Sequence, residues 1–219
     1  MLKSIYLPKL NQLTPTLDST LLKIMEEGGE LARAVLKFLP CEGKLLLDSE
    51  EGRQSRLLLQ DVAEELLDVA QTCVTMLFVM EESYRIQVDT LIDSHLKKLE
   101  DKGYAFDKVR TYSITTTGNF KYLHLPRLRM QQVTLLTTVC KIQEELGELT
   151  QFLGKRAGAS GEAAELGQEE ALLGCAEELL DVAQCCFTMM YILAETYQVD
   201  MESLTEGHIE KLRRKGYWA

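Results

Sequence analysis

The sequence predicts an all-α protein built from two tandem copies of one helical unit. Two observations carry this prediction. Apolar residues recur at helical spacing through most of the chain, and motifs of the first half return in register in the second half. No β-rich domain and no low-complexity segment is apparent. We therefore expect helices to form the whole core, with loops and one linker between them.

The duplication is visible in short motifs. Leu7-Pro8-Lys9-Leu10 recurs 118 positions later as Leu125-Pro126-Arg127-Leu128, and the acidic motif that begins at Glu26 recurs at the same shift. A second acidic motif, Ala63–Gln71, recurs 113 positions later as Ala176–Gln184. The second copy is therefore five residues shorter between its two motifs. Because insertions are tolerated in surface loops, this difference predicts loops near residues 40–55 and 154–167.

Each copy is expected to contain three helices. The first helix begins near Thr14-Pro15-Thr16, with Thr14 as its cap, and ends near Phe38. The second runs from about 55 to 82, and the third from about 88 to 102, where Gly103 stops it. The second copy repeats this plan and stops at Gly216. The chain is thus divided into a first unit at 1–110, an extended linker at 111–120 and a second unit at 121–219.

Composition restricts the partners. The 219 residues carry a formal net charge of −10, which argues against a nucleic-acid polymer because such binding needs clustered Lys and Arg. The apolar runs 69–80 and 182–194 are shorter than the roughly 20 residues that cross a bilayer, so no membrane partner is expected. The first ten residues hold no apolar signal segment, and the six cysteines form no Cys-x-x-Cys pair. These features predict a cytoplasmic protein with reduced thiols.

Acidic residues lie on the apolar faces of four predicted helices. Glu27 lies three residues after Ile24 and four before Leu31, and Glu30 is its neighbour on the helix surface. The same spacing recurs, and the eight acids are Glu27 and Glu30, Glu65 and Asp68, Glu145 and Glu148, and Glu178 and Asp181. Like charges about 4 Å apart repel by roughly 4 kcal/mol at an effective dielectric constant of about 20, so converging carboxylates need a cation. Mg²⁺, which also accepts phosphate oxygens, is the expected ion, with Mn²⁺ as an alternative.

These motifs resemble the Glu-x-x-Glu and Glu-x-x-Asp signature of the MazG-like all-α nucleoside triphosphate (NTP) pyrophosphohydrolases. The matching segments are Glu27–Glu30 and Glu65–Asp68 in the first copy, and Glu145–Glu148 and Glu178–Asp181 in the second. The resemblance covers most of both halves. It implies that Mg²⁺ held by the eight carboxylates supports cleavage of an NTP or dNTP to the monophosphate and pyrophosphate, as in house-cleaning of the nucleotide pool. Family members usually carry one unit per chain and dimerise, so the two copies are expected to form a pseudo-dimeric helix bundle, with a further homodimer as an alternative.

The resemblance also implies roles for residues beside these motifs. Lys98 and Lys211 stand where the family has a lysine near the phosphates, and they would offset charge on the leaving pyrophosphate. Ordinary exposed lysines near helix ends are the alternative for both. Glu30 and Glu148 are our choice for the carboxylates that orient or deprotonate the attacking water.

Histidines and aromatic residues near the third helices are less specific. His95 and His208 stand where many relatives have an asparagine, and a structural role is favoured for both. Tyr104, Tyr217 and Trp218 can either stack on a base or close the core. The residues leave both roles open for the aromatic side chains.

Two other functions are compatible with the helical pattern. One is a non-catalytic nucleotide-binding or regulatory module of the same fold, which the survival of all eight acids disfavours. The other is a bundle for protein contacts, which would not need acids on the apolar faces of both copies. The chain contains no phosphate-binding Gly-x-x-x-x-Gly-Lys motif, no Gly-x-Ser-x-Gly motif and no His-Glu-x-x-His motif.

Overall fold

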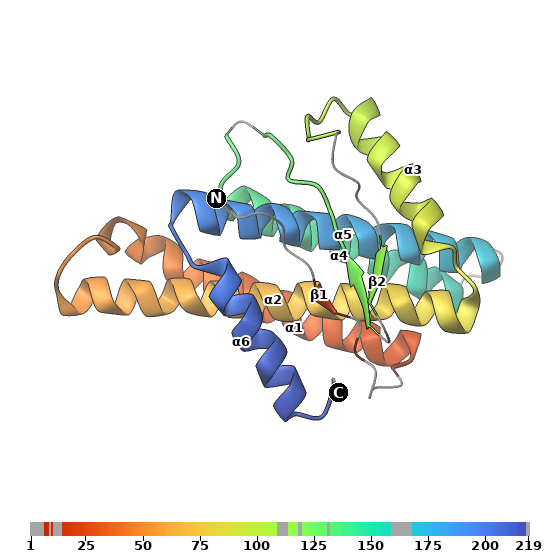
Figure 1. The fold of residues 1–219 in the computed structure, drawn as a ribbon, viewed down its shortest axis with the longest axis horizontal. Helices are drawn as coiled ribbons and strands as arrows, with labels where there is room; N and C mark the ends of the chain where they lie inside the picture. The colour runs from red at the N-terminus through yellow and green to blue at the C-terminus, as the bar shows by residue number, and fades with distance from the viewer. Residues whose placement is uncertain are drawn as a thin grey trace.

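The computed structural model describes residues 7–8, 10, 15–108, 114–117, 120–130, 132–158 and 168–217. These residues are mostly helical, as predicted, and the long helices run alongside one another as one elongated bundle (Figure 1). The described helices are α1 (Leu17–Phe38), the 3-10 helix η1 (Leu39–Lys44), α2 (Glu50–Tyr84), α3 (Val88–Asp101), α4 (Leu135–Ala157), α5 (Gln168–Thr196) and α6 (Met201–Arg214).

The helices α1 and α4 begin with the same hydrogen-bonded cap. The amide of Ser19 donates to Oγ1 of Thr16 (3.1 Å), and the amide of Thr16 donates to Oγ of Ser19 (2.9 Å). Thr134 and Thr137 make the same two bonds before α4, at 3.2 and 2.9 Å. These bonds satisfy amide groups that lack a partner in the first turn of a helix. The cap of α1 is therefore Thr16 rather than Thr14, which lies outside the described residues.

The helix α2 begins well before Ser55, where the sequence predicted its start. The amide of Gly52 donates to Oγ of Ser49 (3.3 Å), so Ser49 caps the helix and the polar residues that follow it are helical. Those residues carry no apolar periodicity, which is why the sequence pattern assigned them to the loop. At the other end of the first repeat, α3 stops before Gly103, whose φ of +80° is the left-handed conformation that the prediction required.

A small antiparallel sheet joins the beginnings of the two repeats. It consists of β1 (Leu7–Pro8), β2 (Ile114–Thr117) and β3 (Phe120–Leu123), in the order β1-β3-β2. Leu7 pairs with Leu123, so residues that stand at the start of each repeat lie side by side. The described residues of the predicted extended linker, 114–117 and 120, thus belong to a sheet.

The core lies among the four long helices. α1 packs on α2, α4 packs on α5, and the two pairs meet through α2 against α5 and α1 against α4. Side chains from both halves form one hydrophobic cluster, in which Phe38 and Phe187 are fully buried. A Cβ atom on Gly28 would lie 2.3 Å from Cδ1 of Leu146, so the glycine allows α1 and α4 to approach closely. The two halves therefore share a single core.

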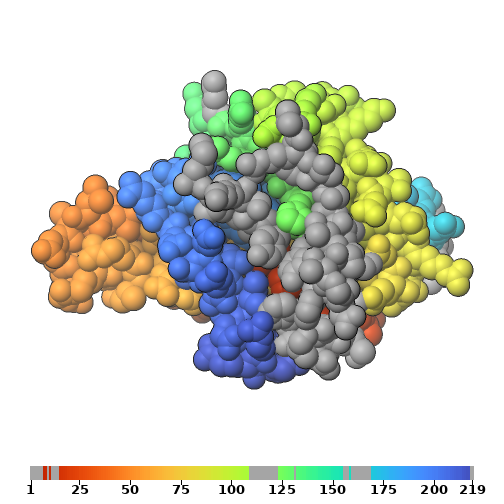
Figure 2. All heavy atoms as spheres, viewed as in Figure 1, coloured from red at the N-terminus to blue at the C-terminus, as the bar shows by residue number. Residues whose placement is uncertain are grey.

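The third helix of each repeat packs mainly on the opposite half. α3 lies against α5, and α6 lies against α2. Both helices lie on the side of the bundle formed by α2 and α5 (Figure 1), and they form two separate parts of the surface in the space-filling view (Figure 2). The sequence pattern did not predict this exchange, and it determines which residues meet at the acidic clusters.

The helix α5 is the one described helix that is long and apolar enough, by length and composition, to cross a membrane. The sequence analysis judged this region too short to cross a bilayer because it counted only the uninterrupted apolar run 182–194. In the fold, the candidate segment Glu169–Thr196 has 67% of its apolar window buried inside the protein. That burial is typical of a helix in the middle of a bundle.

Candidate metal centres

Carboxylates of the first half converge between α1 and α2. Glu27 and Glu30 from α1 and Glu65 from α2 each place one oxygen within 4.8 Å of the others. The spacing of three residues puts the two α1 acids on one face, and α1 packs along α2, so the acids meet. Burial raises the pKa of Glu27 and of Glu65, and the nearby charge of Asp68 raises both further. We name this group, together with Asp68, the first cluster.

The second half forms a corresponding group between α4 and α5. Glu145, Glu178 and Asp181 place one oxygen each within 4.8 Å of one another, and they are only 5%, 9% and 8% exposed. Burial raises the pKa of Glu178 to about 7, and the charges of Asp181 and Glu145 add to that effect. Glu148 is exposed and stands outside this group of three, although its charge also reaches Glu178. We name these three residues the second cluster.

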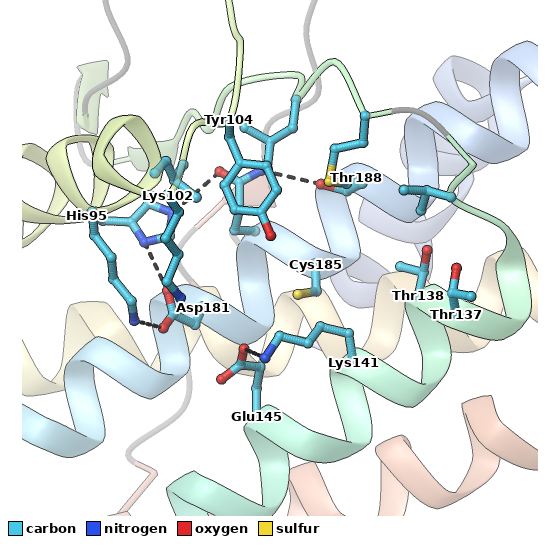
Figure 3. Close-up of a pocket in the computed structure, with 16 residues that line it drawn as sticks. His95, Lys102, Tyr104, Thr137, Thr138, Lys141, Glu145, Asp181, Cys185 and Thr188 are labelled. Atoms are coloured by element: carbon cyan, nitrogen blue, oxygen red, sulfur yellow. Dashed lines mark hydrogen bonds and ion pairs between the residues drawn. The ribbon is translucent and has the colours of Figure 1, made fainter.

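The helix α3 of the first half completes the second cluster. Nδ1 of His95 lies 2.9 Å from Oδ1 of Asp181, and Nζ of Lys98 forms an ion pair with Oδ2 of the same carboxylate (Figure 3). Burial alone would raise the pKa of Asp181, but the hydrogen bonds from His95 and Lys98 bring it below its ordinary value. Asp181 is therefore held ionised by two residues that lie more than eighty positions earlier in the chain.

The helix α6 of the second half completes the first cluster in the same way. Nζ of Lys211 lies 2.8 Å from Oδ2 of Asp68, and Nδ1 of His208 lies 3.5 Å from Oδ1. The resemblance implied that Lys98 and Lys211 lie near the phosphates, but it did not indicate which cluster each lysine would join. The structure pairs the lysine and histidine of each half with the aspartate of the other half.

One further pair of equivalent residues, Lys23 and Lys141, lines the centres, and the sequence analysis assigned these two lysines no function. Lys23 pairs with Glu27, and Nζ of Lys141 lies 2.6 Å from Oε1 of Glu145. The signal was present in the sequence, because both lysines stand four residues before the first acid of their motif and recur at the shift of 118. Each lysine offsets part of the negative charge of its cluster.

Two glutamines connect the helices that carry the second acidic motifs to the segments around Pro8 and Pro126. Nε2 of Gln71 donates to the carbonyl of Pro8 (2.7 Å), and Nε2 of Gln184 donates to the carbonyl of Pro126 (2.9 Å). Both glutamines are buried and occupy equivalent positions in the two repeats. These bonds hold the entry to each repeat against the helix that carries the second acidic motif.

A pocket adjoins each cluster. Its volume is about 480 Å³ beside the first cluster and about 180 Å³ beside the second. Each described residue that lines the first pocket has its repeat counterpart in the lining of the second, including Tyr217 with Tyr104 and Lys215 with Lys102. In Figure 3 the ring of Tyr104 projects into the second pocket above Cys185. Each pocket therefore combines carboxylates, lysines and one tyrosine.

The donor atoms of the clusters fit a hard divalent cation. They are carboxylate oxygens, which Mg²⁺ and Mn²⁺ prefer. Burial raises the pKa of the neighbouring Cys185 thiol to about 12, so this sulfur stays protonated and is a poor metal ligand. Oε2 of Glu178 is buried and has no hydrogen-bond partner among the described residues. A buried carboxylate oxygen without a donor is costly unless a cation binds it, so the second cluster fits such an ion well.

Comparison of the chain with protein-family models, with curated proteins and with solved structures gives no match. The functional assignment therefore rests on the geometry of the two clusters and on the motifs that form them. The two acidic motifs of the first half recur in register in the second half, and three acids of each half converge in space.

The raised pKa of Glu178 predicts how pH changes the stability of the metal-free protein. Its folded-state pKa of about 7 exceeds the ordinary value of 4.5, so the folded state holds a proton that the unfolded state releases. The stabilisation from this proton is complete below pH 4.5 and is lost as pH rises through about 7. We expect the melting temperature in EDTA to fall more steeply between about pH 5 and about pH 8 in wild type than in Glu178→Gln.

This comparison isolates Glu178. Burial lowers the pKa of His208 to about 4, but that residue is present in both proteins and affects both alike. Excess Mg²⁺ should reduce the fall in wild type, because the ion binds the ionised carboxylate. Melting curves in EDTA that have the same pH dependence in both proteins would contradict the assignment of this proton to Glu178.

Proposed function

We propose that the protein is a Mg²⁺-dependent NTP pyrophosphohydrolase that converts an NTP or dNTP to the monophosphate and pyrophosphate. One observation carries the proposal. A cluster of buried or half-buried carboxylates from two helices is completed by a lysine and a histidine from the opposite half, and this arrangement occurs twice beside equivalent pockets. Such a site can hold a cation at one side and an anionic, partly apolar ligand at the other.

We infer that the two repeats are MazG-like units that form a covalent pseudo-dimer. The reciprocal packing of α3 on α5 and α6 on α2 supports this arrangement. So does the contact of Gly28 with Leu146, because these two positions are equivalent in the repeats. Equivalent residues meet each other only near a two-fold axis, as they do in a symmetric dimer.

The carboxylates of both clusters would hold the cations. A bound cation supplies positive charge that neutralises phosphate oxygens. The ion pairs with Asp68 and Asp181 orient the amines of Lys211 and Lys98, which would stabilise negative charge on the leaving pyrophosphate. Glu30 is half-exposed at the edge of the first cluster, where it can accept a proton from a water that enters from solvent.

The pocket walls would hold the rest of the nucleotide. Beside the first cluster, Leu10, Leu212 and Tyr217 present apolar surface, while Lys23 and Lys215 present positive charge. A nucleotide has the same division, with a planar base at one end and phosphates at the other. The overall negative charge of the chain does not oppose this binding, because lysines gather at the pockets.

The proposal is tested by incubating the protein with canonical and modified NTPs and dNTPs in Mg²⁺, in Mn²⁺ and in EDTA. We expect a monophosphate and pyrophosphate in the presence of either ion, and no product in EDTA. Melting curves are recorded with Mg²⁺ and a nucleotide analogue that resists cleavage between its α- and β-phosphates, because a bound ligand raises the melting temperature whether or not the protein is an enzyme. A raised melting temperature without any product would indicate a non-catalytic nucleotide-binding module. If neither a thermal shift nor a product is seen, the nucleotide proposal is wrong.

A further inference from the structure

We propose that the two centres are unequal: the first cluster opens on the pocket that admits the nucleotide, whereas the second cluster holds a cation in a pocket closed to nucleotides. This inference rests on the proposed function and adds a division of labour between two sites that the recurring motifs alone would make identical. In this division Lys211 serves the pyrophosphate, and Lys98 balances the charge of Asp181 in the second cluster. It predicts two cations and one nucleotide for each chain.

The carboxylates of the two clusters differ in their access to solvent. The side chain of Asp181 is 10% exposed, and that of Asp68 is 22% exposed. Glu178 is buried with an unpartnered oxygen, whereas its counterpart Glu65 is half-exposed. The second cluster therefore depends more strongly on a cation for its neutralisation, and the first is more accessible to a ligand from solvent.

The histidine from the opposite half is held more firmly at the second cluster. Nδ1 of His95 faces Asp181 at 2.9 Å, and its Nε2 faces Oε1 of Gln184 at 3.4 Å, so polar contacts hold the ring on both sides. At the first cluster, Nδ1 of His208 is 3.5 Å from Asp68.

At the first cluster, the equivalent residues His208 and Gln71 do not make the contact that joins His95 to Gln184. Nε2 of His208 and Oε1 of Gln71 are both buried, and neither has a hydrogen-bond partner among the described residues. Moving the His208 ring to admit a ligand therefore breaks fewer polar contacts than moving the His95 ring. Two buried polar atoms without partners are also costly, so a rearrangement that satisfies them is favourable.

The volumes of the two pockets also favour nucleotide binding at the first cluster. The first pocket, at about 480 Å³, falls in the range of roughly 300–1,000 Å³ that is usual for small-molecule sites, and the second, at about 180 Å³, falls below it. The chain that leaves α3 is tied to the segment that lines the second pocket at Leu128 and Met130, because the amide of Arg129 donates to the carbonyl of Ala105 (2.7 Å). The repeat counterparts of Arg129 and Ala105, which are Asn11 and Trp218, lie outside the described residues.

Two binding measurements on the full chain test this inference. The first measurement uses electron paramagnetic resonance of the free ion to count the Mn²⁺ ions that the protein binds without nucleotide. The second uses calorimetry in Mg²⁺ to count the bound molecules of an NTP analogue that cannot be hydrolysed between its α- and β-phosphates. We expect two Mn²⁺ ions and one nucleotide. Two nucleotides of similar affinity would overturn the inequality and leave the proposed function intact. Bound Mn²⁺ without any nucleotide binding would overturn the proposed function, and the inequality with it.

A matched pair of variants assigns the single nucleotide to its pocket. Ser19 and Thr137 are exposed, line the first and second pockets respectively, and make the same capping bonds. Ser19→Trp and Thr137→Trp should therefore destabilise their helices equally. We expect Ser19→Trp to weaken nucleotide binding at least about tenfold and Thr137→Trp to change it less than about twofold, with melting curves that confirm folding of both. An equal effect of the two substitutions would overturn the inequality.

Discussion

Replacing Glu65 and Glu178 together by glutamine should greatly slow pyrophosphate release and, at the same time, raise the melting temperature of the metal-free protein. Each glutamine keeps the shape of the side chain but removes one negative charge from a cluster whose members raise one another's pKa. Without a cation the repulsion falls, so the fold gains stability. With Mg²⁺ a ligand is lost from each cluster, and we expect turnover to fall by about a thousandfold, which corresponds to about 4 kcal/mol in the barrier. Pyrophosphate assays and calorimetry in EDTA measure the two effects.

The chain offers a matched control for this variant. Glu64 and Glu177 directly precede the two cluster acids, are exposed, and occupy equivalent positions in the repeats. The double change Glu64→Gln with Glu177→Gln alters the net charge by the same amount but leaves both clusters intact. It should leave turnover and metal-free stability close to wild type. Wild-type turnover in the Glu65→Gln and Glu178→Gln protein would refute the catalytic role of the clusters.

Lys211→Met should lower turnover by about a hundredfold while Mn²⁺ binding is retained. Lys211 lies 143 positions after Asp68 in the chain, yet its amine is held 2.8 Å from that carboxylate. Loss of one donor that stabilises developing charge typically costs about a hundredfold to a thousandfold in rate. Removing a positive charge from the first cluster does not weaken its attraction for a cation. Steady-state kinetics together with Mn²⁺ titration therefore separate a role in phosphate stabilisation from a role in metal binding.

Arg214→Met is the control for this substitution. Arg214 lies on the same helix, one turn further on, and is exposed. Its replacement by methionine changes the net charge by the same amount as Lys211→Met, but Arg214 lies outside the first pocket. Equal losses in Arg214→Met and Lys211→Met would show that the overall charge, rather than the amine beside Asp68, controls the rate. Lys211→Arg should recover part of the activity because it keeps the charge.

Several features of the fold followed from local sequence. Helical periodicity identified the helices, and Gly103 and Gly216 marked two of their ends, where the chain takes a positive φ. The two acids of each motif lie one turn apart on a helix because positions three apart are neighbours on its surface, but Glu148 is exposed and stands apart from the other acids of the second half. Helix starts were less accurate, since Thr16 and Ser49 cap their helices through bonds that apolar spacing does not reveal.

The sequence alone determined that this chain is helical and that its acidic motifs recur, because helical periodicity and the spacing within each motif involve residues that are close in the chain. Only the tertiary structure decided which helices meet. The exchange of α3 and α6 pairs Lys98 with Asp181 and Lys211 with Asp68, and the short sheet joins Leu7 to Leu123. Contacts between distant segments depend on how whole faces pack, and two similar halves offer each helix two similar partners. Local periodicity reports the face of a helix, but it does not report the helix against which that face is buried.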